Sequence, residues 1–340
     1  MKTALNRLPG ILLAAVIALP AWWLGKQFPI IGAPVIAMVF GILLASLKRP
    51  AILDDGIRYT ARTLLQYAII LLGFGMDLFQ VFWVGTHTCC LMGVTLVITL
   101  ATAFAAGRLL KIEGNTTTLI GVGTAICGGS AIAATAPIIG ASDEEITRAI
   151  STIFLFNLAA AFLFPFLGHT LHMTDDGFGL WTGTAVNDTS SVVAAGYTFS
   201  ETAGDLAVIV KLTRTLMIVP ITLLLALHMS RQTASPNGRA VHHITRIFPW
   251  FILGFVITSL IGTFTPEPFN IAYLLAPPGK FLIAMAMASI GLNTRVAMLL
   301  REGGKPILLG LVCWFILSLA AWVILSVTSL SAATLSNLPA

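Results

Sequence analysis

Charged side chains are scarce in this sequence. Asp, Glu, Lys and Arg make up 10% of the 340 residues, whereas soluble domains carry about 25%. Hydrophobic residues make up 57%, and the mean hydropathy is +0.94. This composition excludes an ordinary soluble protein and predicts an all-α polytopic protein whose partner is the lipid bilayer. The net charge of +5 is explained by basic residues in short loops and indicates no nucleic-acid partner.

Cysteine is also rare, and motifs for chemistry are lacking. Cys89, Cys90, Cys127 and Cys313 form no C-x-x-C pair and no Cys/His cluster, so neither a zinc site nor a disulfide framework is indicated. The segment Gly73–Asp77 reads G-x-G-x-D, one residue longer than the G-x-G-D of intramembrane aspartyl proteases, and no G-x-S-x-G elbow is present. We therefore expect no enzyme activity and no cofactor.

Apolar runs long enough to cross a bilayer dominate what is present. Two further segments, about 117–140 and 178–199, are apolar but broken by glycine. Nine spans are expected if both segments are re-entrant hairpins, and eleven if both cross fully; two interrupted helices that cross each other also fit. The nine clear runs lie near 8–25, 31–47, 63–80, 86–107, 149–171, 206–229, 248–264, 272–293 and 306–328.

The basic residues give the predicted orientation. With the N-terminus in the cytoplasm, fourteen fall inside and only Lys26 falls clearly outside, as the positive-inside rule requires. Arg148 joins the inside set only if the first glycine-broken segment is a hairpin. The fourteen are Lys2, Arg7, Lys48, Arg49, Arg58, Arg62, Arg108, Lys111, Arg231, Arg239, Arg246, Arg295, Arg301 and Lys305.

The two glycine-broken segments contain near-copies of one motif, 60 residues apart. Gly123–Ala134 reads GTAICGGSAIAA, and Gly183–Ala194 reads GTAVNDTSSVVA. In lipid, broken backbone is tolerated only where it is buried in protein or lines a cavity. Small residues also serve close helix packing, but a matched pair of breaks indicates the binding site of a transporter.

Ionisable residues within apolar segments are few and lie near the second motif. Asp188 belongs to that motif, while Lys211 and Arg214 are three residues apart and share one helix face. An intramembrane charge costs at least about 2.5–3.5 kcal/mol, so each indicates a function. Plainer interpretations are that Lys211 snorkels or neutralises Asp188, that Asn157 joins helices, and that Asp77 ends a helix.

At these residues the chain resembles the YeiH-like family of bacterial inner-membrane proteins, which carries the label of sulfate exporters. The resemblance covers nearly the whole chain. The family is grouped with cation:proton antiporters and anion transporters, which implies a core of interrupted or re-entrant helices that moves against a scaffold. Homodimers are common for this architecture. The resemblance rests on Gly123–Ala134, Gly183–Ala195, Val210–Arg214, Ile69–Phe74 and Ile290–Thr294.

We therefore expect one transporter domain over residues 1–340, with intertwined halves near 1–171 and 172–340 in an inverted repeat. The N-terminus would be cytoplasmic and the C-terminus periplasmic. The predicted function is secondary active transport of a small anion, namely sulfate or a small sulfonate or carboxylate, coupled to H⁺ or Na⁺. A cation/proton antiporter centred on Asp188 is the second hypothesis, and an anion channel is the third.

The predicted substrate site lies between the two motifs. One carboxylate and two cations leave one net positive charge there, and protonation of Asp188 would leave two. Asp188 is the expected coupling residue, and Na⁺ could bind at Asn187 and Asp188. The expected substrate-binding residues are Thr124, Cys127, Gly128, Gly129, Ser130, Asn187, Thr189, Ser190, Lys211 and Arg214.

Overall fold

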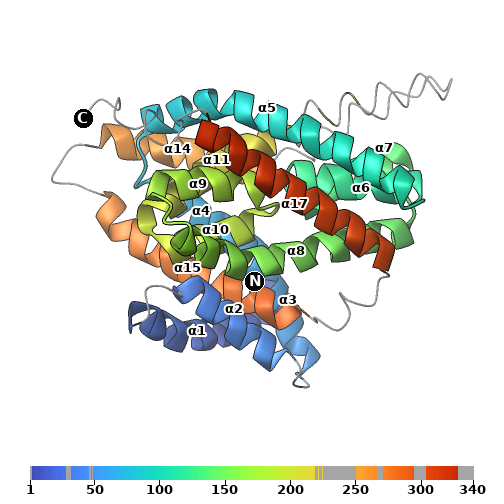
Figure 1. Cartoon of the computed structure of the whole chain (residues 1–340). Helices are drawn as coiled ribbons and strands as arrows, with labels where there is room; N and C mark the ends of the chain where they lie inside the picture. Colours follow the sequence, from blue (N-terminus) through green and yellow to red (C-terminus); the bar gives the residue numbers. More distant parts are fainter. Residues whose placement is uncertain are drawn as a thin grey trace, which may run out of the picture.

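The computed structural model describes most of the chain, and every regular element in the described part is a helix (Figure 1). This confirms the predicted all-α polytopic membrane protein. Among the described residues, four helices are by length and composition able to cross a membrane: Asn6–Gln27, Leu78–Leu109, Asp143–Thr170 and Gly304–Val327. The described residues are 2–27, 32–45, 47, 49–218, 221, 224, 250–265, 271–294 and 304–327.

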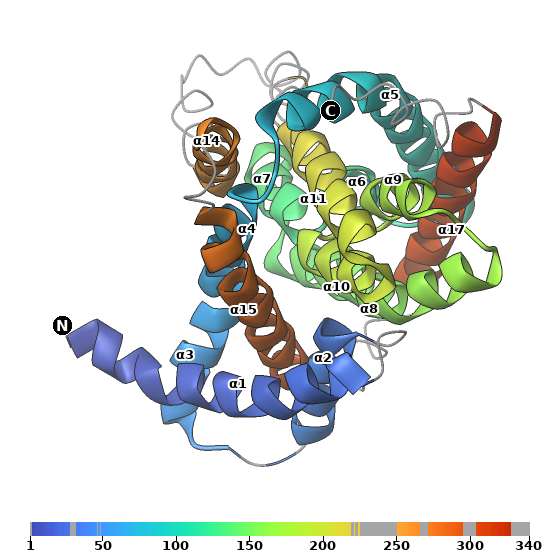
Figure 2. The ribbon, with the colours of Figure 1, turned by 90° about the vertical axis from the view of Figure 1, so that its left-hand side faces the viewer.

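One group of helices forms a first bundle (Figure 2). In this bundle α2 and α15 approach each other closely, and a Cβ on Gly41 would lie 2.2 Å from the carbonyl oxygen of Ala288. Only glycine permits so close an approach of two helix backbones. The members are α1 (Lys2–Gln27), α2 (Ala33–Leu44), η1 (Ala51–Leu53), α3 (Asp54–Tyr59), η2 (Thr60–Leu64), α4 (Leu65–Gly73), α14 (Trp250–Phe264) and α15 (Ile271–Asn293).

The remaining helices form a second bundle, which contains both glycine motifs (Figure 2). Each bundle takes helices from before and after residue 171. The members of the second bundle are α5 (Leu78–Leu109), α6 (Gly114–Ala125), α7 (Gly129–Ile139), α8 (Asp143–Thr170), α9 (Asp175–Ala185), α10 (Thr189–Phe199), α11 (Glu201–Leu216) and α17 (Gly304–Val327).

The first motif segment, α6 and α7, is a re-entrant hairpin. The side chain of Asn115, at the start of α6, donates to Glu145 Oε2 at 3.2 Å, and Arg148 lies 3.5 Å from Glu113. Glu145 and Arg148 belong to the first turns of α8, directly after α7. The start of α6 and the end of α7 therefore lie together, which excludes a full span.

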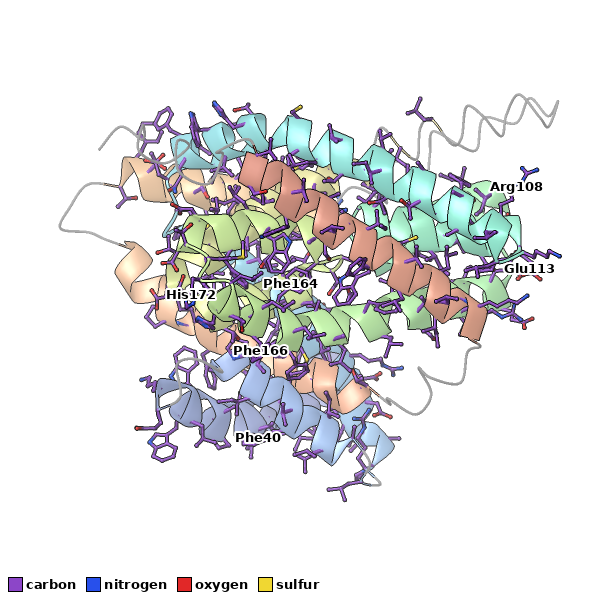
Figure 3. The ribbon with its side chains drawn as sticks, in the orientation of Figure 1. Phe40, Arg108, Glu113, Phe164, Phe166 and His172 are labelled. Carbon is purple, nitrogen blue, oxygen red and sulfur yellow. The ribbon has the colours of Figure 1, made fainter. Side chains whose placement is uncertain are left out.

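The second motif segment, α9 and α10, is also a hairpin, and it enters from the other end. Phe178, near the start of α9, stacks on Phe199, at the end of α10, with ring centroids 4.0 Å apart. His169, near the end of α8, stacks on the same ring at 4.4 Å. The 28 residues of α8 extend over about 42 Å, so the bases of the two hairpins lie at opposite ends, near Glu113 and His172 in Figure 3.

In the described part of the chain both motif segments are hairpins, which agrees with the predicted version of nine spans and two re-entrant hairpins; the number of spans itself stays a prediction. We call the end of the second bundle that carries Arg108, Lys111 and Arg148 the basic end. Lys48, Arg231, Arg239, Arg246, Arg295 and Arg301, with parts of the predicted spans 206–229 and 248–264, lie outside the described residues.

The predicted boundary near residue 80 was wrong. The expected span 63–80 ends at Gly73, and α5 begins at Leu78 rather than near 86. The reason is Asp77, whose Oδ1 accepts from the backbone N–H groups of Phe79 at 2.6 Å and Gln80 at 3.2 Å. An aspartate N-cap starts a helix even inside an apolar run. Asp77 therefore marks a helix terminus, as interpreted, but it starts α5 rather than ending the preceding helix.

Cysteine labelling tests the hairpin topology. In a chain with Cys89→Ser and Cys90→Ser, we expect Lys111→Cys and Arg148→Cys to react with an impermeant maleimide from the same side of the membrane. His172→Cys should react only from the opposite side. Comparing intact spheroplasts with inverted vesicles measures this directly. Labelling of Lys111→Cys and Arg148→Cys from opposite sides would contradict the first hairpin.

Candidate functional site

The tips of the two hairpins meet at a single buried lysine. The Lys211 ammonium donates to the carbonyl oxygen of Ile126 at 2.9 Å and to that of Val186 at 2.8 Å. Ile126 belongs to the break between α6 and α7, and Val186 to the break between α9 and α10. One side chain on α11 therefore bridges both glycine motifs, and the predicted convergence of the motifs is observed.

Arg214 makes the same connection one helical turn later. Its Nε donates to the carbonyl of Ala125 at 2.8 Å and its Nη2 to that of Thr124 at 3.1 Å, while its Nη1 donates to the carbonyl of Thr184. The last carbonyls of a helix have no partner within the helix and carry the negative end of its dipole. Arg214 thus neutralises the ends of α6 and α9 together.

The plainer interpretations of Lys211 do not describe its position. Its exposed fraction is 0%, so the side chain does not snorkel to an interface. In the described part of the chain, no ion pair joins Lys211 to Asp188. The ammonium and the Arg214 guanidinium instead form a buried cationic floor beneath the two hairpin tips.

The starts of α7 and α10 differ in whether a side chain caps the helix. Asp188 caps α10: its Oδ2 accepts from the backbone N–H of Ser190 at 3.0 Å and from the Ser190 hydroxyl. Gly128 occupies the same position for α7, with φ 67° and ψ −127°, and no side chain caps that helix. The positive end of the α7 dipole is therefore uncompensated, while that of α10 faces a carboxylate.

The predicted site residues divide into a buried set and an accessible set. Thr124 contributes its carbonyl, because its hydroxyl donates to the Ile120 carbonyl within α6 at 2.8 Å. Ser130 is exposed, and Gly129, Asp188 and Thr189 are half-buried. The buried set consists of Thr124, Cys127, Gly128, Asn187, Ser190, Lys211 and Arg214.

Two buried carboxamides, those of Asn187 and Asn157, border the hairpin tips. Asn187 is 1% exposed, and among the described residues neither atom of its amide has a hydrogen-bond partner. Asn157, on α8, is 4% exposed, and its Oδ1 is unpartnered. A Cβ on Gly128 would lie 3.5 Å from both Asn157 Nδ2 and Asp188 Cβ, so Asn157 borders the site. The predicted residue set omitted it, although its lone polar side chain between Phe154 and Phe164 was the available signal.

The donor set at the hairpin tips suits an anion better than a transition metal. The described residues contain no group of three or more His, Cys, Asp or Glu side chains that could hold a metal ion. What they bring together is two cations, one carboxylate, two carboxamides and an uncapped helix start. The predicted Na⁺ position at Asn187 and Asp188 remains a prediction.

Paired hairpins that meet tip to tip from opposite ends define a class of polytopic helical membrane protein. A family model described as conserved hypothetical protein 698 matches residues 9–310. No solved structure matches the chain. The matched region includes both motifs and the helix that carries Lys211 and Arg214.

Curated relatives match almost from end to end. A UPF0324 membrane protein of Streptococcus pyogenes serotype M6 is 46% identical over 327 residues, which cover 94% of this chain and 96% of the relative. One from Fusobacterium nucleatum is 44% identical over 335 residues, covering 92% and 96%. The chain belongs to this family, the UPF0324 membrane proteins, which is the YeiH-like group.

Proposed function

We propose that this protein is a secondary active transporter that carries a small anion by alternating access. The observation that carries the proposal is the tip-to-tip meeting of the two hairpins over Lys211 and Arg214. Paired breaks near the middle of the membrane are where such transporters bind substrate. We place the basic end in the cytoplasm of a bacterial inner membrane, because basic residues favour that side.

The local charge favours an anion. Each helix end carries about half an elementary charge, and the two starts and two ends at this site cancel. Lys211, Arg214 and Asp188 then leave one net positive charge. Sulfate, a small sulfonate or a small carboxylate would bind at the accessible start of α7. Asp188 would hold the coupling H⁺ or Na⁺, since neutralising it relieves its repulsion of the anion.

A cation/proton antiporter is the second candidate. It is favoured by the half-buried Asp188 carboxylate beside the unpartnered amide of Asn187, because both supply oxygen ligands that suit Na⁺. In that case the cationic floor would only hold the hairpin tips together. The two candidates differ in whether any anion crosses the membrane.

Uptake into proteoliposomes distinguishes the candidates. We expect labelled sulfate, methanesulfonate or acetate to accumulate under an imposed pH or Na⁺ gradient. Asp188→Asn should abolish the stimulation by the gradient, and Lys211→Ala, if it stays monodisperse, should lower the flux at least tenfold. Anion flux that neither substitution changes would refute the site. Na⁺/H⁺ exchange without anion flux would establish the second candidate, and discrete current steps in a planar bilayer would indicate a channel.

A further inference from the structure

Asn157 occupies a position on α8 that parallels the position of the two cations on α11. Each of these helices directly follows one hairpin, α8 after α6 and α7, and α11 after α9 and α10. Each presents a buried polar side chain to the hairpin tips, a carboxamide on α8 and two cations on α11. The cations have carbonyl partners, whereas the carboxamide oxygen of Asn157 has none in the described part of the chain.

The surroundings of Asn157 do not fit a residue that merely joins helices. Such a residue would hydrogen-bond across an interface, yet the described chain offers its carboxamide no partner, and Oδ1 is buried without one. Its Nδ2 instead lies 3.5 Å from the Cβ position of Gly128, directly at the uncapped start of α7. A buried carboxamide without a partner is unfavourable by itself, and a bound ligand beside the start of α7 would supply the missing partner.

We propose that Asn157 is a substrate-binding residue that donates its carboxamide N–H to the transported oxyanion beside the start of α7. The proposal rests on the anion transport proposed above and specifies which chemistry recognises the substrate. An oxyanion accepts hydrogen bonds on several oxygens in different directions, so donors from α8 and α7 can act together. A halide gains less from directional donors, and Asn157 therefore selects oxyanions over chloride.

The adjacent carboxylate fits this arrangement. Asp188 Cβ lies 3.5 Å from the same Gly128 Cβ position that Asn157 approaches. The bound oxyanion and the coupling ion on Asp188 would then be neighbours and would stabilise each other electrostatically. Sulfate should accordingly bind more tightly when H⁺ or Na⁺ is available to neutralise Asp188.

Sulfate binding to the purified full-length protein in detergent tests the proposal. The shift in unfolding temperature is measured with sodium sulfate against sodium chloride at equal ionic strength. Asn157→Asp keeps the size of the side chain but replaces the donor with an acceptor. We expect its apparent dissociation constant for sulfate to rise at least about tenfold, the equivalent of about 1.4 kcal/mol. Asn157→Gln, which retains a donor, should fall between this variant and the wild type.

Thr152→Val is the matched control. Thr152 lies on the same helix, is fully buried and has an unpartnered hydroxyl, but it faces Gly310 of α17 rather than the tips. The control should bind sulfate as the wild type does. Unchanged sulfate affinity in Asn157→Asp would refute the role of Asn157, as would an equal loss in Thr152→Val. A wild-type protein that no anion stabilises would refute the proposed function itself.

Discussion

Arg214→Ala should prevent stable folding of this protein. The guanidinium is the donor for three buried backbone carbonyls, those of Thr124, Ala125 and Thr184. Leaving one buried acceptor unpaired costs about 1–3 kcal/mol, and native proteins are stable by only about 5–15 kcal/mol. Leaving three carbonyls without a donor therefore removes much of the free energy of unfolding. The yield of monodisperse protein and the unfolding temperature in detergent measure the loss.

Two further substitutions make the Arg214 result specific. Arg214→Lys keeps a cation but cannot reach three carbonyls with a planar fork, so its unfolding temperature should lie between those of the wild type and the alanine variant. Arg58→Ala removes an exposed arginine paired with Asp55, and such pairs contribute about 1 kcal/mol or less. An Arg214→Ala protein as stable as the Arg58→Ala control would show that the carbonyls find other donors.

Gly128→Ala should abolish transport and destabilise the protein. The backbone of Gly128 has φ 67° and ψ −127°, a region that residues with a Cβ avoid at about 1–3 kcal/mol. The new Cβ would find ordinary contact distances of 3.4–3.5 Å to Ile153, Asn157 and Asp188. The loss is therefore conformational, and it moves the start of α7. Thermal unfolding and anion uptake by proteoliposomes measure the two effects.

Gly114→Ala is the control for the Gly128 substitution. Gly114 begins α6 in the same hairpin, and a Cβ there would meet nothing within 4 Å. This variant should transport and unfold like the wild type. Full activity in Gly128→Ala would mean that the first break does not need its left-handed backbone.

The repeat in the sequence predicted much of this arrangement. Two motifs 60 residues apart predicted paired breaks, and the spacing of Lys211 and Arg214 predicted one shared helix face. Arg148 favoured the hairpin version, and the structure places that residue beside Glu113. These features are local, so the pattern of residues was enough to find them.

The contacts of those residues could not be predicted, because they join distant parts of the chain. Lys211 donates to a carbonyl 85 residues away, and Arg214 to one 90 residues away. Nothing in the sequence distinguishes a carbonyl that ends a broken helix from any other. Asn157 was undervalued for the same reason, since only the folded chain places it beside Gly128.

The bridge made by Lys211 and Arg214 also limits how the protein can move. Separating the hairpin tips would strip hydrogen bonds from two fully buried cations, and each bond to a charged group is worth about 1.5–3 kcal/mol. The two hairpin tips therefore stay in contact and move as one unit. In the transport mechanism proposed above, access from each side would therefore alternate by displacement of the whole second bundle against the bundle of α1, α2, α4, α14 and α15, and the substrate would move with the second bundle.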